Sequence, residues 1–397
     1  MSKRRKQFLT STPNSPEKYS PAVAIVGSNL DLVTETLLRV PAKSLIKFKC
    51  VSKHWLSLIS DSNFAINHTR RNPTPPVSGI YVGAKWSKSL ILKDQFSPFS
   101  LGGRRGTSSL PALSFLRDAI SGDYSKVSHS SNGLFLCRNG NTNYSYIVCN
   151  LTTQKFIPLP KPSFTSSGYL SCMEEPYLIF DPTKSPHYKV VLVNSSHLLN
   201  ASQLAIYTSE FASWKNVSLE PRIDNFRRGV IWNGGIIWRS CSRCEHIYYQ
   251  LDVDTEKLTV TRVPPDPNLS TCVIYFGECG GRLLLIQLPI NDAMEFKVFE
   301  MDRDDFRWIV RYRVDLTSLI LPNRSRCVIS VISVVRGANE NDLEVVFYNR
   351  GKVYSCNLEY RTMKVLCELS PGEISNFGLA KELHERSYQF IKSLSPV

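Results

Sequence analysis

The stretch from Leu30 to Asp61 holds more apolar side chains than so short a segment can bury by itself. These side chains recur at intervals of three and four residues, which predicts three short helices with breaks near Pro41 and Ser52. A unit of this size falls below the roughly 40 to 60 residues at which single domains begin to fold alone. We therefore expect a second polypeptide to cover its remaining apolar face. The residues at helical spacing are Leu32, Val33, Leu37, Val40, Leu45, Phe48, Val51, Trp55, Leu58 and Ile59.

The same segment resembles the F-box of plant proteins in the order and the spacing of its residues. It departs from the usual motif at Ser28-Asn29, where Leu-Pro is common, and at Thr36, where Ile is usual. Both departures are expected to weaken adaptor contacts without removing the central apolar residues. The matching runs are Asp31-Leu32, Arg39 to Leu45, Phe48 to Lys53 and Leu58 to Asp61, with Glu35, Leu37, Trp55 and Phe64 in register.

The resemblance implies docking onto the Skp-type adaptor of a Skp–cullin–F-box ubiquitin ligase and, through that adaptor, onto the cullin. Family position assigns adaptor contacts to eight residues, which are Leu32, Leu37, Val40, Pro41, Leu45, Val51, Trp55 and Ile59. An ordinary all-α domain is an alternative, but no further amphipathic helices follow. A helix-turn-helix is another, but the last helix offers Trp55, Leu58 and Ile59 where a groove reader needs polar side chains.

Charge and cysteine content restrict the class of protein. The net charge of +14 is spread along the chain, and general basicity favours weak attraction to anionic partners without identifying one. The basic cluster Lys3 to Lys6 suits a nuclear address, but the Ser/Thr/Pro-rich residues behind it favour a disordered tail over residues 1–28. Eleven scattered cysteines, the absence of a signal-peptide core and the absence of a long apolar run predict a cytoplasmic or nuclear protein without a membrane partner.

Residues 69–78 are predicted to form a linker, because three prolines favour extended geometry and the composition cannot build a core. Residues 79–397 then change to short segments rich in Val, Ile, Tyr and Phe, separated by turn signals such as Asn132-Gly133 and Asn233-Gly234. This region is predicted to be all-β, with the polar segment Gln95 to Leu113 excluded as a strand. The predicted strands include 133–137, 144–149, 188–193, 204–207, 230–238, 247–252, 283–288, 296–301 and 343–348.

An approximate repeat runs through the β region, in which a strand end is followed six or seven residues later by the start of a return strand. The last four repeats begin at Tyr207, Asp252, Asp302 and Asn357, which are separated by 45, 50 and 55 residues. A four-stranded propeller blade takes about 40 to 50 residues, so a region of roughly 320 residues predicts six or seven blades. The paired positions are Asn150 with Phe156, Tyr207 with Trp214, Asp252 with Leu258, Asp302 with Trp308, and Asn357 with Met363.

The β region is similar to the F-box-associated, kelch-like β-propellers of plant F-box proteins. The resemblance implies a multidomain chain, with a small all-α F-box of three helices at residues 29–68 and an all-β propeller at residues 79–397. A pair of β-sandwiches is the structural alternative. The matching segments are Ser131 to Leu134, Val148 to Thr153, Phe180 to Pro182, Tyr188 to Val191, Ile206-Tyr207, and Leu251-Asp252 with Thr255 to Lys257.

Catalytic and metal-binding patterns are not found. Cys241 and Cys244 form a single Cys-x-x-Cys without a second pair at zinc spacing, so neither a metal nor a cofactor is expected. No nucleophile elbow or His-Glu-x-x-His motif occurs, and the tryptophans of the β region are expected to pack in the core rather than to line a binding face.

Together these patterns predict a non-catalytic substrate-recognition subunit of a ubiquitin ligase, whose F-box docks the adaptor and whose propeller binds a target protein. Two other classes remain open. One is an interaction scaffold that works without a cullin. The other is a nucleic-acid-binding propeller, which the dispersed charge does not favour.

Overall fold

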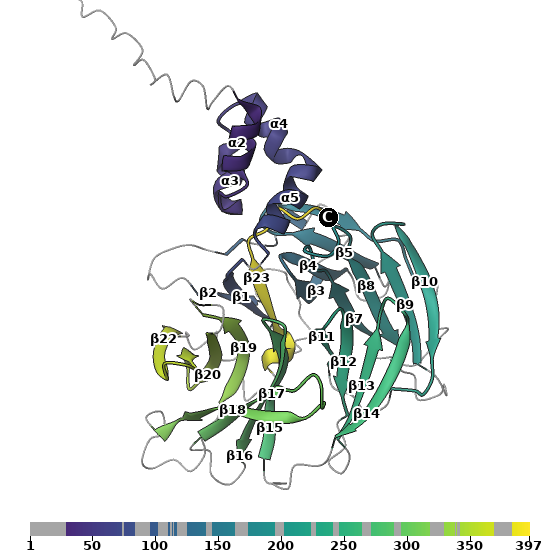
Figure 1. Ribbon diagram of the computed structural model, residues 1–397, viewed down its shortest axis with the longest axis vertical. Coiled ribbons are helices and arrows are strands. Elements are labelled where there is room, and N and C mark those ends of the chain that lie inside the picture. Colours follow the sequence, from purple (N-terminus) through teal and green to yellow (C-terminus); the bar gives the residue numbers. More distant parts are fainter. Residues whose placement is uncertain are drawn as a thin grey trace, which may run out of the picture.

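The computed structural model describes residues 29–73, 75–83, 96–101, 110–111, 113, 115–116, 125–139, 145–162, 174–194, 202–223, 228–240, 246–263, 271–289, 295–317, 329–337, 339, 342–368 and 383–397. Within them, a helical unit (residues 29–73) stands beside a ring of β-sheets (Figure 1). The predicted tail at residues 1–28, Trp86 and the Cys241–Cys244 pair lie outside the described residues.

The helical unit contains four helices in the described residues, so the prediction of three was wrong. They are α2 (Leu30–Leu37), α3 (Ala42–Phe48), α4 (Lys53–Ser60) and α5 (Ser62–Arg71). Side chains cap three of the starts: Asn29 accepts from the N–H groups of Asp31 and Leu32, Ser52 from Trp55, and Asp61 from Phe64. Helix α5 is mostly polar and gives only a weak apolar repeat. It continues to Arg71, so the first three residues of the predicted linker are helical.

Five four-stranded antiparallel sheets form the blades of a propeller, and each is a simple meander. Around the axis of the ring, the first strands contact each other between blades one and two, blades three and four, and blades four and five. Blade one is β3 (Ser125–Ser131), β4 (Leu134–Asn139), β5 (Ser145–Asn150) and β6 (Lys155–Pro158). Blade two is β7 (Glu174–Ile179), β8 (Lys189–Asn194), β9 (Ser202–Thr208) and β10 (Ser213–Leu219). Blade three is β11 (Val230–Trp232), β12 (Gly235–Arg239), β13 (His246–Asp252) and β14 (Lys257–Val263). Blade four is β15 (Thr271–Cys279), β16 (Arg282–Pro289), β17 (Glu295–Met301) and β18 (Trp308–Asp315). Blade five is β19 (Ser330–Arg336), β20 (Leu343–Asn349), β21 (Lys352–Asn357) and β22 (Thr362–Glu368).

A three-stranded sheet closes the ring between blade five and blade one. It pairs β2 (Phe96–Ser100) with β1 (Val77–Gly83), and β1 with β23 (Ser387–Ile391), so both ends of the β region share one sheet. Strand β23 contacts β3 on one side and β19 on the other. The prediction of six or seven blades was wrong, because dividing the length by the repeat counted this shared sheet as complete blades. Strand β2 also lies in the segment that had been excluded as a strand.

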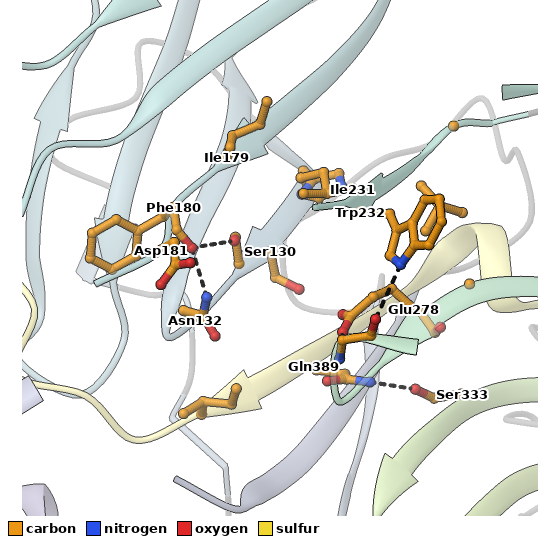
Figure 2. Close-up of a pocket in the computed structure, with 18 of the residues that line it drawn as sticks. Ser130, Asn132, Ile179, Phe180, Asp181, Ile231, Trp232, Glu278, Ser333 and Gln389 are labelled. Carbon is orange, nitrogen blue, oxygen red and sulfur yellow. Dashed lines mark hydrogen bonds between the residues drawn. The ribbon is translucent and has the colours of Figure 1, made fainter. Parts of the chain in front are cut away.

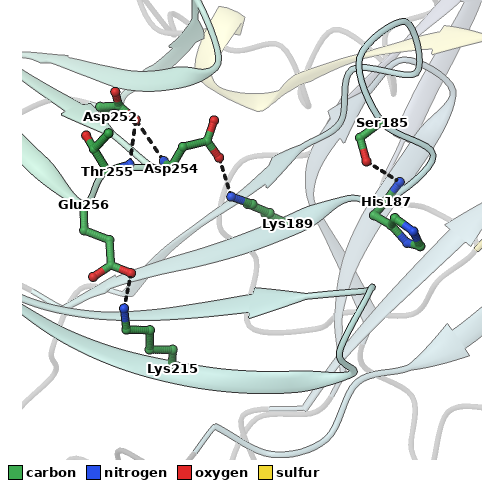
Figure 3. Close-up of polar contacts among 8 residues, drawn as sticks. All are labelled: Ser185, His187, Lys189, Lys215, Asp252, Asp254, Thr255 and Glu256. Atoms are coloured by element: carbon green, nitrogen blue, oxygen red, sulfur yellow. Dashed lines mark hydrogen bonds and ion pairs between the residues drawn. The ribbon is translucent and has the colours of Figure 1, made fainter.

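The predicted repeat coincides with the hairpin between the third and fourth strands of every blade. In four blades an Asn or Asp accepts hydrogen bonds from the N–H groups two and three residues later, as Asp252 does from Asp254 and Thr255 (Figure 3). Each of the five turns then has a non-glycine residue with positive φ, a conformation that costs energy and that the surrounding hairpin holds in place. These residues are Gln154, Ala212, Glu256, Phe306 and Arg361. All the predicted strands quoted above are confirmed, with 230–238 forming the β11–β12 hairpin.

Tryptophan side chains join the blades to one another. Trp238 is fully buried, and its indole N–H donates to the hydroxyl of Tyr177 in the preceding blade, at 2.9 Å. The indole N–H of Trp308 likewise donates to the hydroxyl of Tyr248, and that of Trp232 donates to the carbonyl of Gly281. These contacts confirm core packing for Trp232 and Trp238, whereas Trp214 and Trp308 are half-buried.

Ion pairs lie outside these buried contacts. Lys189 and Lys215 of blade two reach Asp254 and Glu256 on the β13–β14 turn of blade three, both at 2.5 Å (Figure 3). Because three of the four side chains are well exposed or half-exposed, water and salt screen their charges. We therefore assign the cohesion between these blades mainly to the buried aromatic contacts.

Candidate functional site

The interior of the helical unit contains three of the eight residues assigned to adaptor contacts. Leu37, Leu45 and Ile59 are at most 2% exposed and pack with Phe64 of α5 in one apolar cluster. In this position they support the outer surface rather than form it. Val40 and Trp55 are half-buried at the edge of the cluster, and the Trp55 ring lies edge-on to Phe48 with 5.6 Å between centroids.

The outer surface carries the other three, with Leu32 and Val51 45% and 61% exposed and Pro41 also exposed. Leu30 and Leu56 are 49% and 48% exposed, and the sequence reasoning missed both as surface residues. A helical-wheel projection about the buried residues of α2 and α4 would have placed both side chains on the outer side. Helices α2 and α4 stand away from the ring (Figure 1), so a partner can reach this surface. Exposed large apolar residues on so small a unit indicate a protein-binding surface. Whether the eight assigned residues contact an adaptor stays a prediction.

Helix α5 holds the unit together through a buried histidine. The Nε2 atom of His68 lies 2.8 Å from the carbonyl oxygen of Val40, and the side chain of Asn72 donates to the carbonyls of Leu38 and His68. Burial lowers the pKa of His68, because the charged ring is poorly solvated there, and the hydrogen bond to Val40 opposes this effect only in part. The ring is therefore neutral in the folded unit at neutral pH.

Acidification is expected to destabilise the helical unit. An unfolded histidine takes up a proton near pH 6.5, whereas the folded His68 resists it, so the free energy of unfolding falls as the pH drops below about 6.5. The slope is at most about 1.4 kcal/mol per pH unit for one proton. Hydrogen exchange of the α5 amides at pH 5 and pH 7.5 measures this loss of stability in the helical unit alone. A global measurement would also include the propeller, where burial lowers the pKa of His129. Equal protection at both pH values would contradict the expectation. The His54→Gln variant, on the exposed side of α4, should behave like the wild type.

The second candidate site is the central channel of the propeller, with a volume of about 530 Å³. The first strands of the blades and β23 line it, and Figure 2 shows polar side chains from several of them facing the opening. Much of this polarity joins neighbouring sheets. The side chain of Asn132 donates to the carbonyl of Phe180, and that of Gln389 donates to Ser333.

Two charged side chains stand out in the channel. Arg228 donates to the carbonyls of Ser128 and Glu385, and its guanidinium lies 5.4 Å from the centre of the Tyr388 ring. Burial raises the pKa of Glu278, whose carboxylate accepts from the N–H of Gly281 at 2.5 Å. Both groups are engaged in holding neighbouring sheets or turns. No group of three or more His, Cys, Asp or Glu side chains that could hold a metal occurs among the described residues. None of the described helices has the length and apolar character that a membrane span requires.

Comparison with known proteins identifies both parts of the chain. The model of the F-box domain matches residues 29–67, and that of the KIB1-4 beta-propeller matches residues 107–348, more than half of the chain. F-box protein At5g07610 of Arabidopsis thaliana is 27% identical over an alignment 423 residues long, gaps included, and this alignment covers 95% of this chain and 94% of the relative. The putative F-box protein At3g10240 of the same plant is 26% identical over 263 residues, which cover 64% of this chain and 65% of the relative.

Proposed function

The chain belongs to the plant F-box proteins with a KIB1-4 β-propeller, and on that basis we propose that it is the substrate-recognition subunit of a Skp–cullin–F-box ubiquitin ligase. The F-box docks the Skp-type adaptor, and through it the cullin. The propeller binds the target protein, and the complex works in the cytoplasm, the nucleus or both. The matching family model describes a KIB1-4 beta-propeller and does not specify a kelch repeat, so a kelch-type repeat stays a prediction.

The observation that carries the proposal is the exposure of large apolar residues on a unit whose interior is already filled. Leu32 and Val51 project from the F-box while Leu45 fills its core. Burying such residues in a partner removes apolar surface from water, which favours binding by roughly 25 cal/mol per Å² of that surface. A few central residues carry most of the binding energy of a protein–protein interface.

The chain contributes position rather than chemistry in this proposal. Holding two reactants in the correct geometry turns an encounter between separate molecules into a step within one complex, and this can supply several kcal/mol of the barrier reduction. Transfer of ubiquitin is left to other subunits. We therefore propose no cofactor for this chain.

The test compares binding of a purified Skp-type adaptor to the wild type and to the Val51→Glu and Leu32→Glu variants. A carboxylate at either position would have to be desolvated in the interface, so we expect binding to weaken by about a hundredfold. Phe211→Glu is the matched control, because Phe211 is 71% exposed on an outer turn of the propeller. Unchanged adaptor affinity in both F-box variants, with their helical circular dichroism intact, would refute the assignment.

Ion pairs on the propeller count against a nucleic-acid-binding function. On the outer strands Arg311, Arg313 and Lys352 pair with Glu300, Glu295 and Glu368. Such pairing reduces the local positive potential that phosphate binding needs.

A further inference from the structure

Residues 392–397, which we call the connecting segment, follow β23 and run between the helical unit and blade one. Leu394 is 4% exposed and belongs to the apolar cluster of the helical unit, with Leu45 and Phe64. Figure 1 shows this end of the chain beside α5. One side chain from the far end of the β region therefore completes the core of the F-box.

Blade one holds the same segment from the other side. Asn150 is fully buried, and its Nδ2 atom donates to the carbonyl oxygens of Ser393 and Ser395 at 3.1 and 2.9 Å. Its Oδ1 atom accepts from the N–H groups of Thr152 and Thr153, which forms the β5–β6 turn. The hydroxyl of Thr152 in turn accepts from the N–H of Ser393 at 3.2 Å. Asn150 thus uses one end of its amide for the turn and the other end for the connecting segment.

Close packing fixes the path of the segment over blade one. A Cβ atom on Gly133 would lie 2.5 Å from the Cβ atom of Ser393 and 3.1 Å from the carbonyl oxygen of Ile391. Only glycine leaves room for this approach, and its φ of +91° suits glycine as well. Beyond it, Val397 packs against the apolar cluster shared by blades one and two.

Charge does not hold the two parts together here. Burial, with Lys43 of α3 nearby, lowers the pKa of Lys392, and burial, with Lys155 of β6 nearby, lowers that of Lys49. Both pairs bring like charges together across the boundary between F-box and propeller. The attractive contacts of the connecting segment with the two parts include the apolar contact of Leu394 and the hydrogen bonds of Asn150.

We propose that the connecting segment is the strut that sets the orientation of the F-box relative to the propeller, with Asn150 and Leu394 as its positioning residues. The linker between α5 and β1 joins the two parts along the chain, whereas the strut adds a second attachment about 320 residues later. Two attachments prevent the rotation that one short linker permits. The purpose of the strut rests on the proposed function, since a ligase receptor must hold its target at a set distance from the site of transfer.

The test substitutions are Asn150→Asp and, as a matched control, Asn357→Asp. Aspartate keeps the turn, because Asp252 and Asp302 accept the same pair of N–H groups in blades three and four. It removes the amide that donates to Ser393 and Ser395 and places a carboxylate against their carbonyl oxygens. Asn357 occupies the same turn position in blade five, and its Oδ1 atom accepts from Glu359 and Tyr360.

Hydrogen exchange of the full chain, followed by mass spectrometry, measures the protection of residues 392–397. We expect exchange there to accelerate by roughly ten- to a hundredfold in Asn150→Asp and to stay at the wild-type rate in Asn357→Asp. Small-angle X-ray scattering should show a broader distribution of distances for Asn150→Asp only. Leu394→Ala should loosen the segment in the same way, and Leu394→Met, which conserves volume, should restore it. Wild-type protection in Asn150→Asp, or equal loosening in Asn357→Asp, would overturn the proposal.

A second readout separates this inference from the proposed function. In a ligase reconstituted with the adaptor, Asn150→Asp should bind the adaptor with wild-type affinity but change which propeller lysines receive ubiquitin. Unchanged lysine selection in a variant whose segment exchanges freely would overturn the positioning role. If the wild type failed to bind the adaptor at all, the proposed function would fail, while exchange and scattering would still decide whether the strut exists.

Discussion

Replacing Trp238 with alanine is expected to lower the free energy of unfolding of the propeller by about 3 to 5 kcal/mol. The side chain is fully buried between blades two and three, edge-on to the Tyr177 ring with 5.8 Å between centroids. Its removal leaves a cavity that the surrounding strands cannot fill. It also leaves the Tyr177 hydroxyl without its indole donor, although the N–H of Gly229 still donates to it at 2.9 Å.

Urea unfolding followed by circular dichroism measures the loss. Tyr177→Phe separates packing from hydrogen bonding, because it keeps the ring but leaves the N–H groups of Gly229 and Trp238 without their acceptor. Each buried unsatisfied donor costs about 1 to 3 kcal/mol. Phe211→Ala, at an exposed turn, should change stability by less than about 0.5 kcal/mol. A loss below about 1 kcal/mol in Trp238→Ala would show that this contact does not hold the two blades together.

Leu45→Ala is expected to destabilise the helical unit by about 2 to 5 kcal/mol, which is a large fraction of what so small a unit can possess. Leu45 is 0% exposed at the centre of the cluster that joins the four helices to Leu394. The variant should therefore bind the adaptor weakly because its F-box is unfolded. Hydrogen exchange of the α2 and α4 amides without the adaptor should be fast in Leu45→Ala and slow in Val51→Glu.

This pair of variants also tests the assignment of adaptor contacts. If Leu45→Ala kept its amides protected and still lost the adaptor, Leu45 would be a contact residue, as family position alone implies. Saturating adaptor should restore protection to Leu45→Ala, because a partner that binds only the folded form stabilises it. If saturating adaptor did not restore protection while Val51→Glu stayed folded, the unfolding of Leu45→Ala would not be coupled to adaptor binding.

Much of the fold was predictable because its signals are local. Helical spacing located α2 to α4, and the spacing of short apolar segments located the β-strands. The turn at Asn132-Gly133 is a two-residue hairpin with positive φ at both positions, as its sequence predicts. Arg350-Gly351 adopts the same conformation without an Asn, and no turn was predicted there.

The candidate site was predictable only in part. Spacing identified which apolar residues of the F-box recur at helical intervals. It did not identify which of them are buried inside the unit and which stay on its surface. Leu37, Leu45 and Ile59 occupy the interior because α5 and Leu394 pack against them. The prediction of an F-box at residues 29–68 did not identify α5 as a helix and did not include Leu394. Leu32 and Val51 stay outside because nothing within the described chain covers them.

The amino-acid sequence by itself determined most of the turns and strands of the blades, since an Asn or Asp that binds the N–H two residues later acts within one short stretch of chain. The third-to-fourth-strand repeat occurs five times, at Asn150, Tyr207, Asp252, Asp302 and Asn357, once in each complete blade, although the length of the region led to a prediction of six or seven blades. Only the tertiary structure decided how the ring closes through β1 and β23 and where the F-box sits on it. The bond from Asn150 to Ser393 spans 243 residues, and contacts at such separation leave no periodic trace in the sequence because they depend on surfaces that exist only after the blades have stacked.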